Sequence, residues 1–142
     1  MNLASLQRQR QAFENSPIIR GGSPSPIVKK GYSYEDKVGL VLETVATETG
    51  LVLLNHPWIE DDGWHQPDYL LISPSNSVIV LEVKLTYTLE GVVQLARYQR
   101  VLSKDYDSVT RVLVCKNLAR GCPAPIESLY DAYDDATWHL YL

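Results

Sequence analysis

The sequence predicts one α/β domain in which a mixed central sheet is flanked by helices. Short apolar segments with the two-residue alternation of strands are bounded by turn residues, and two longer segments carry apolar residues at helical spacing. The length of 142 residues suits a single domain with a sizeable core. In chain order the predicted elements are α-β-β-β-α-β, followed by a C-terminal α-β addition.

Residues 1–31 are predicted to form a basic N-terminal arm, and residues 32–142 to form the domain. Helical spacing between Leu3 and Phe13 allows a short helix, and the Pro-, Gly- and Ser-rich segment after it indicates an extended linker. Residues 1–30 carry five basic side chains and one acidic (net +4), whereas the rest carries eight basic and sixteen acidic (net −8). The arm is a candidate contact for phosphates, with a solvated tail as the equal alternative. Its basic residues are Arg8, Arg10, Arg20, Lys29 and Lys30.

The first helix of the domain is predicted to begin at Ser33, because Ser33 and Asp36 have the spacing of a capping box, and to end near Gly50. Its apolar stripe consists of Val38, Val41, Leu42 and Val45. Thr88 is predicted to cap a second helix that continues to about Lys104.

Five apolar segments are predicted to be strands. A polar and aromatic loop, His56–Gln66, precedes the second of them, and a short helix is expected near Ile126–Tyr133, before the last. The predicted strands are Leu51–Leu54, Asp68–Ser73, Ser77–Leu85, Thr110–Lys116 and Thr137–Leu142.

The segment Pro67–Lys84 carries charged residues at the ends of two neighbouring apolar strands. Alternation along the second strand places Glu82 and Lys84 on one face, opposite a fully apolar face. The turn residues Pro74–Ser77 could fold the two segments into a hairpin that brings Asp68 beside Glu82. Two converging carboxylates and a lysine suit a hard cation and a water molecule that attacks a phosphodiester.

This segment, with Pro67-Asp68 followed by Glu82-Val83-Lys84, resembles the PD-(D/E)xK nuclease superfamily, and the similarity in element order covers most of the chain. The resemblance implies a restriction-endonuclease-like core and a Mg²⁺-dependent nuclease that hydrolyses DNA, with Mn²⁺ able to replace Mg²⁺. It also implies that the main-chain carbonyl of Val83 binds the metal together with Asp68 and Glu82. DNA processing, recombination or repair, for example in a phage, is the expected setting. A catalytically silent DNA-binding or assembly subunit is the alternative, and endonuclease and exonuclease action both remain open.

Superfamily members often add a glutamate from the first helix, and two residues are candidates. The sequence around Glu35 resembles that of Holliday-junction resolvases, whereas Gly39-x-x-x-Glu43 resembles the first motif of RecB-like nucleases. Relative to Val38, Glu35 lies at about 60° and Glu43 at about 140° around the helix axis. Glu35 is therefore closer to the core-facing stripe and is favoured as the catalytic glutamate.

Gln94 and Tyr98 in the second predicted helix form a Q-x-x-x-Y motif, which resembles the last motif of RecB-like nucleases and phage exonucleases. Residues four apart share a helix face, so both could point toward the metal site as accessory residues. The candidate phosphate contacts are Arg97, Arg100, Lys29 and Lys30.

Other metal and cofactor chemistry is not expected. Cys115 and Cys122 have no common zinc spacing and are too few for an iron–sulfur cluster, and Cys115 is expected in the core. The loop residues His56, His65, Asp61 and Asp62 contain no zinc motif, so they are expected to form a polar mouth to the site, with His65 as a weaker supporting candidate. No Gly-rich phosphate loop or dinucleotide motif indicates an organic cofactor.

The sequence has no apolar run of transmembrane length and no apolar block near its start. We therefore expect a cytoplasmic protein, in the host cytoplasm if it is encoded by a phage. DNA is the expected partner, within a homo-oligomer or a larger DNA-processing complex, without a membrane.

Overall fold

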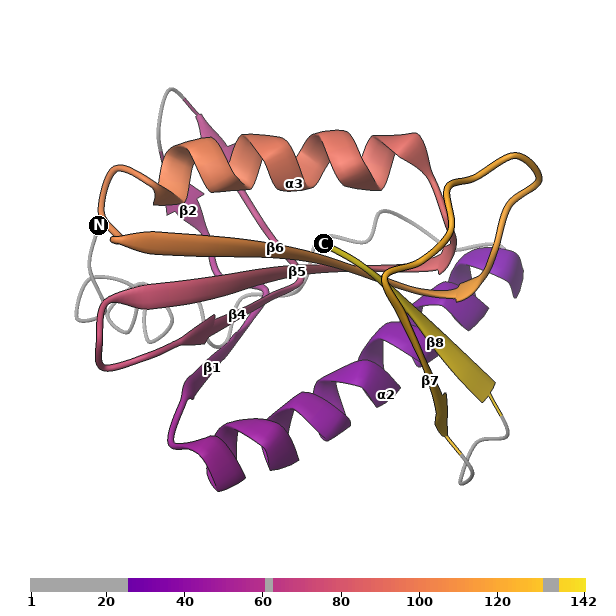
Figure 1. Ribbon diagram of the computed structural model, residues 1–142, viewed down its shortest axis with the longest axis horizontal. Helices are drawn as coiled ribbons and strands as arrows, with labels where there is room; N and C mark the ends of the chain where they lie inside the picture. Colours follow the sequence, from indigo (N-terminus) through magenta and orange to yellow (C-terminus); the bar gives the residue numbers. More distant parts are fainter. Residues whose placement is uncertain (1–25, 61–62, 132–135) are drawn as a thin grey trace.

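The computed structural model describes residues 26–60, 63–131 and 136–142, which form a mixed α/β structure with two helices and a six-stranded mixed sheet (Figure 1). Two further short strands, β2 and β3, form a separate two-stranded sheet. The helices are α2 (Pro26–Thr49) and α3 (Leu89–Leu102). The strands are β1 (Val52–Asn55), β2 (Ile59–Glu60), β3 (Trp64–His65), β4 (Tyr69–Ile72), β5 (Ser77–Thr86), β6 (Ser108–Asn117), β7 (Glu127–Asp131) and β8 (Ala136–Tyr141).

The six-stranded sheet has the order β1-β4-β5-β6-β8-β7. Neighbouring strands are antiparallel except β5 and β6, which run parallel. A parallel pair needs a crossover connection, and α3 provides it (Figure 1). The predicted α/β class with a mixed sheet and helices is confirmed, and the five predicted strands are present with small shifts at their ends.

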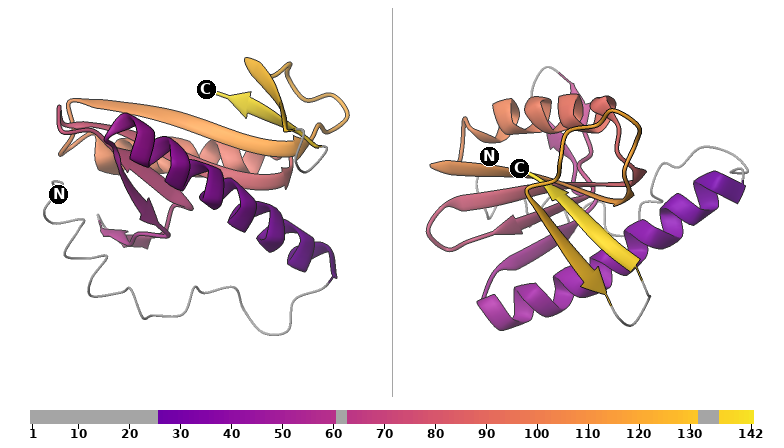
Figure 2. Two further views of the ribbon diagram at one scale, coloured as in Figure 1. Left: turned by 90° about the horizontal axis from the view of Figure 1, so that it is seen from below. Right: turned by 45° about the vertical axis from the view of Figure 1, so that its right-hand side comes forward.

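The two helices cover opposite faces of the sheet, so the protein has two apolar layers (Figures 1 and 2). Because strand side chains alternate, Leu70 and Val80 pack with α3, whereas Leu71 and Leu81 pack with α2. Each of these side chains is at most 5% exposed, and burial of one such side chain contributes about 1.5–3 kcal/mol. A shift of the strand register by one residue would turn these apolar side chains to the opposite face of the sheet. Their burial therefore fixes the register and with it the direction in which Glu82 projects.

Helix α3 begins where the sequence predicted. Thr88 has an extended backbone, and its hydroxyl accepts a hydrogen bond from the Gly91 N–H at 3.1 Å. This N-cap satisfies one of the main-chain donors left free at a helix start. The helix then runs above β5 and β6, and its buried residues face the sheet.

Helix α2 begins earlier than predicted. Ser33 lies inside the helix, so the capping box at Ser33 and Asp36 is not its start. For residues 26–31 the prediction of an extended linker is also wrong, because these residues form the first turns of α2. Proline is compatible with a first helical turn, and an interior glycine such as Gly31 costs only about 1 kcal/mol. Residues 1–25, including the predicted N-terminal helix, lie outside the described residues.

The helix predicted near Ile126–Tyr133 is wrong, because this segment contains strand β7. Leu129 pairs with Trp138 in an antiparallel ladder with β8, so pairing with a neighbouring strand determines the structure here. The predicted loop His56–Gln66 also contains β2 and β3, in which Ile59 pairs with His65. Cys115 is fully buried in the α3-side core, as predicted.

Within the described residues, neither helix combines the length and the apolar character needed to cross a membrane.

Candidate functional site

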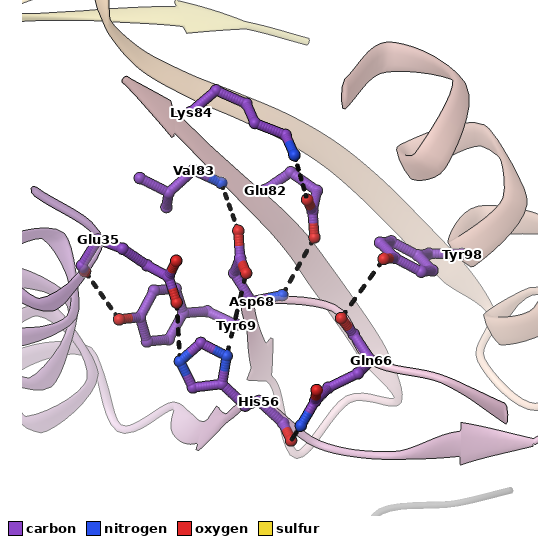
Figure 3. Close-up of polar contacts among 9 residues, drawn as sticks. All are labelled: Glu35, His56, Gln66, Asp68, Tyr69, Glu82, Val83, Lys84 and Tyr98. Carbon is purple, nitrogen blue, oxygen red and sulfur yellow. Dashed lines mark hydrogen bonds and ion pairs between the residues drawn. The ribbon is translucent and has the colours of Figure 1, made fainter. Parts of the chain in front are cut away.

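The β4–β5 hairpin brings the two predicted carboxylates together. Tyr69 pairs with Leu81 in antiparallel register, so Asp68, just before β4, lies opposite Glu82 of β5. The Asp68 main-chain N–H donates to Glu82 Oε1 at 3.2 Å, and the Val83 N–H donates to Asp68 Oδ2 at 2.7 Å (Figure 3). Each carboxylate is thus held by a main-chain donor of the neighbouring strand.

Lys84 lies two residues after Glu82 on the same strand, and its Nζ is 3.8 Å from Glu82 Oε2. The start of α3 packs close to the aliphatic part of this lysine. A Cβ at Gly91 would lie 3.4 Å from Lys84 Cγ and 3.1 Å from Leu113 Cδ1. The first contact is ordinary and the second is tight, so the glycine lets the start of α3 approach Leu113 of β6 closely.

Glu35 enters the site from α2, on the other side of the sheet from α3 (Figure 3). It is only 9% exposed, which is rare for a glutamate. Its main-chain carbonyl accepts a hydrogen bond from the Tyr69 hydroxyl at 2.8 Å. Gly39, one turn later, permits this contact, because a Cβ at that position would overlap the Tyr69 hydroxyl. This close approach of helix and sheet positions Glu35.

The second candidate glutamate, Glu43, is exposed two turns further along α2. It lines an open surface pocket of about 220 Å³ together with Asp36, Asn55 and His56. The structure therefore places Glu35, and not Glu43, beside the carboxylate of Asp68.

His56 is a member of the site that the sequence prediction assigned only to a polar loop. Its Nε2 lies 2.9 Å from Glu35 Oε1 and its Nδ1 lies 3.9 Å from Asp68 Oδ1. The candidate ligand atoms of these three residues all lie within 4.8 Å of one another. His56 directly follows β1, and its main-chain N–H donates to the Asp68 carbonyl at 2.8 Å. A histidine at the end of the strand that pairs with the Asp68 strand was the signal available in the sequence.

Burial and mutual repulsion change the acidity of the central carboxyl groups. Burial, reinforced by the charge of Glu35, raises the pKa of Asp68 to about 6. Burial, reinforced by Asp68, raises the pKa of Glu82 to about 8, while Lys84 partly offsets both shifts. Clustered carboxylates that resist ionisation in this way are typical of functional sites, and a bound cation would relieve their repulsion.

The motif residues of α3 lie on the same side as Glu82. Burial raises the pKa of the Tyr98 hydroxyl, and the charges of Glu82 and Asp68 raise it further. This hydroxyl donates to the Gln66 carbonyl at 3.4 Å, and the Tyr98 ring lies edge-on to His65. Gln94 lies one turn before Tyr98, and among the described residues its buried Oε1 has no hydrogen-bond partner.

The predicted phosphate contacts in the described residues belong to the two helices. Arg97 and Arg100 are exposed on α3, next to Tyr98. Lys29 and Lys30 belong to α2, and their side-chain positions are outside the described structure. Also outside it are Arg8, Arg10, Arg20, Asp61 and Asp62.

The contrast between the two helix glutamates gives a first prediction. For the nuclease activity that the sequence resemblance implies, we expect Glu35→Gln to lower the rate about 10- to 100-fold, because it removes a charge that contacts His56 and influences Asp68. Glu43→Gln serves as the matched control and should leave the rate within about twofold. Cleavage rates and melting temperatures of both variants check this, and a larger loss in Glu43→Gln would contradict the placement of Glu35 in the site.

Comparison of this chain with protein-family models, curated proteins and solved structures gives no match. Its function is therefore inferred from the contacts and charges of the residues themselves.

Proposed function

We propose that the protein is a metal-dependent nuclease that hydrolyses phosphodiester bonds of DNA. The observation that carries this proposal is the pairing of two mutually repelling carboxylates, the partly buried Asp68 and the buried Glu82, with the ammonium group of Lys84 two residues after Glu82 on β5. The order α2, β1, β4, β5, α3, β6 supports a restriction-endonuclease-like core, since it is the order that the sequence resemblance implies.

The residues of the site fit a hard divalent cation such as Mg²⁺. Asp68 and Glu82 provide carboxylate oxygens, which are the ligands that Mg²⁺ prefers. The Val83 N–H points toward Asp68, and the N–H and C=O of a strand residue lie on the same edge, so the Val83 carbonyl is directed to this edge as well. When bound, the ion would lower the pKa of a water molecule and neutralise charge on the scissile phosphate.

The protein's own residues then have separable tasks. Hydrogen bonds from main-chain N–H groups hold Asp68 and Glu82 in place, so little reorganisation is needed when a cation binds. Lys84 can orient or deprotonate the attacking water, or stabilise the negative charge that develops on the phosphate. Tyr98 and the buried wall of α3 limit access of bulk water from one side.

Two exposed arginines support DNA as the substrate. Arg97 and Arg100 lie on the same helix as Tyr98. From α3 they could contact the phosphates that flank a scissile bond near Lys84. Such contacts position the backbone and are independent of base sequence.

The test is incubation of the protein with Mg²⁺ and a panel of linear, circular and branched DNAs, with EDTA as the metal-free control. We expect cleavage that depends on Mg²⁺ and falls about 100-fold or more in Asp68→Asn, which keeps the shape of the side chain but removes its charge. Cleavage by Asp68→Asn at the wild-type rate would contradict the proposal. Absence of cleavage on every DNA, with DNA binding retained, would instead favour a catalytically silent DNA-binding module.

A further inference from the structure

We propose that His56 is a metal ligand, and that the pair Glu35–His56 creates a position selective for a divalent transition-metal ion beside Asp68. This inference rests on the proposed function in one respect. Asp68 would bind both the Mg²⁺ ion of the hydrolytic site and the ion proposed here at His56. The inference assigns a chemical role to a histidine whose side chain is only 10% exposed and which the hydrolytic mechanism above does not use.

The distances around the imidazole define two different contacts. Nε2 lies 2.9 Å from Glu35 Oε1, so the two side chains are in direct contact, and Nδ1 is the ring nitrogen that faces Asp68. Nδ1 lies 3.9 Å from Asp68 Oδ1, too far for a hydrogen bond. Two ligands that are each about 2.1 Å from one ion can be separated by such a distance. Nδ1 and Asp68 Oδ1 are therefore spaced as ligands of a shared ion.

Glu35 then has the role of a positioning residue. Metal-binding histidines commonly donate their second ring N–H to a carboxylate, which fixes the tautomer and the orientation of the ring. The Glu35 carboxylate, 2.9 Å from Nε2, is placed to accept this hydrogen bond once an ion binds at Nδ1. The hydrogen bond from the Tyr69 hydroxyl holds the Glu35 main chain against β4. In Figure 3 the His56 ring contacts Glu35 of α2 through one nitrogen and faces Asp68, at the start of β4, through the other.

The backbone of His56 is held from both sides. Its N–H donates to the Asp68 carbonyl at 2.8 Å, and its carbonyl accepts from Gln66 Nε2 at 3.1 Å. The Gln66 main-chain carbonyl in turn accepts a hydrogen bond from the Tyr98 hydroxyl, so α3 supports His56 through Gln66. His56 adopts a left-handed backbone with φ 48°, which few residue types other than glycine adopt readily. The backbone that carries the ring is therefore fixed in position before any ion binds.

The donor atoms determine which ion this position takes. Mg²⁺ prefers oxygen ligands and retains several waters, whereas imidazole nitrogen favours first-row transition-metal ions. A position formed by one imidazole nitrogen and the Asp68 carboxylate should therefore bind Mn²⁺ more tightly than Mg²⁺. Replacement of the nitrogen by an oxygen should remove most of this preference.

The experiment uses Mn²⁺ and Mg²⁺ with the full chain in the absence of DNA. Pulsed electron paramagnetic resonance of bound Mn²⁺ should show coupling to an imidazole nitrogen in the wild type and none in His56→Asn. Asparagine tolerates the left-handed backbone at this position and presents an oxygen near the place of Nδ1. Calorimetric titration should show Mn²⁺ affinity about 10- to 100-fold weaker in His56→Asn, with Mg²⁺ affinity changed much less. His139→Asn, at a histidine of β8 that contacts Ser128, is the control and should retain both the coupling and the affinity.

Two results separate this inference from the proposed function. Nitrogen coupling that depends on His56, in a protein that cleaves no DNA, would support the metal position and contradict the nuclease. Mg²⁺-dependent cleavage in a protein whose bound Mn²⁺ lacks nitrogen coupling would overturn the role of His56 and leave the nuclease standing. Failure of Mn²⁺ to bind the wild type would also overturn the role of His56 as a metal ligand. An unchanged preference for Mn²⁺ over Mg²⁺ in His56→Asn would overturn it as well.

Discussion

Replacement of Glu82 by glutamine is expected to abolish DNA cleavage and, at the same time, to stabilise the metal-free protein at alkaline pH. Glu82 is 3% exposed, and burial next to Asp68 raises its pKa from 4.5 to about 8. The folded state thus favours the protonated carboxyl group. As pH rises above 4.5, ionisation in the unfolded state lowers the free energy of unfolding, and this loss is complete above about pH 8.

The glutamine variant cannot ionise at this position, and its amide oxygen can still accept the Asp68 N–H. We therefore expect its free energy of unfolding to exceed that of the wild type by about 1–3 kcal/mol at pH 9, with a difference that shrinks toward pH 5. Denaturation in EDTA between pH 5 and pH 9 measures this, and Glu48→Gln, at an exposed position of α2, is the control. Cleavage should fall about 100-fold or more because a metal ligand is lost.

The two readouts of Glu82→Gln move in opposite directions, which distinguishes a functional carboxylate from a structural one. A glutamate retained for stability would make the variant less stable, whereas one retained for metal binding makes the metal-free variant more stable. Stability that is independent of pH in the wild type would contradict the repulsion between Asp68 and Glu82. Mg²⁺ should also stabilise the wild type more at pH 8 than at pH 6, because ionised ligands bind it.

The part of the site on one hairpin could be predicted from sequence, because its geometry follows from local rules. The two-residue period of β5 determines that Glu82 and Lys84 share a face, and the turn before it determines that Asp68 faces Glu82. Thr88 as an N-cap and the apolar pattern of α3 also act over a few residues. The structure places these residues as predicted.

The contribution of His56 could not be predicted in the same way. Its contact with Glu35 joins residues of two different elements, and it depends on how closely α2 approaches β4. That approach requires the absence of a side chain at Gly39, which sequence spacing alone does not reveal. Histidine has no intrinsic preference that distinguishes a ligand from a polar loop residue.

The errors at α2 and β7 also have tertiary causes. Proline and glycine around residues 21–31 indicate a linker by local preference, yet residues 26–31 are helical. Likewise, β7 carries no strong strand signal, and its structure results from pairing with β8 at the edge of the sheet. In both places the local sequence preference is weak enough for the surrounding structure to override it.

Lys84→Met is expected to lower DNA cleavage by about 100-fold or more, since a positioned acid–base or charge-stabilising group typically contributes 10²–10⁴ to the rate. Methionine retains the aliphatic stem that packs near Gly91, so the fold should persist. Mg²⁺ affinity should be retained, because the substitution removes a positive charge 3.8 Å from Glu82 and leaves both carboxylates in place. Single-turnover cleavage together with calorimetric titration of Mg²⁺ measures the two effects.

Lys116→Met, at an exposed lysine of the neighbouring strand β6, is the matched control and should change neither cleavage nor Mg²⁺ affinity. Loss of cleavage with unchanged Mg²⁺ binding assigns Lys84 to the chemical step, because a ligand defect would weaken both. A wild-type rate in Lys84→Met would contradict its catalytic role. Parallel loss of cleavage and Mg²⁺ binding would instead make the lysine a structural partner of Glu82, whose pKa would then rise further because the offsetting charge is gone.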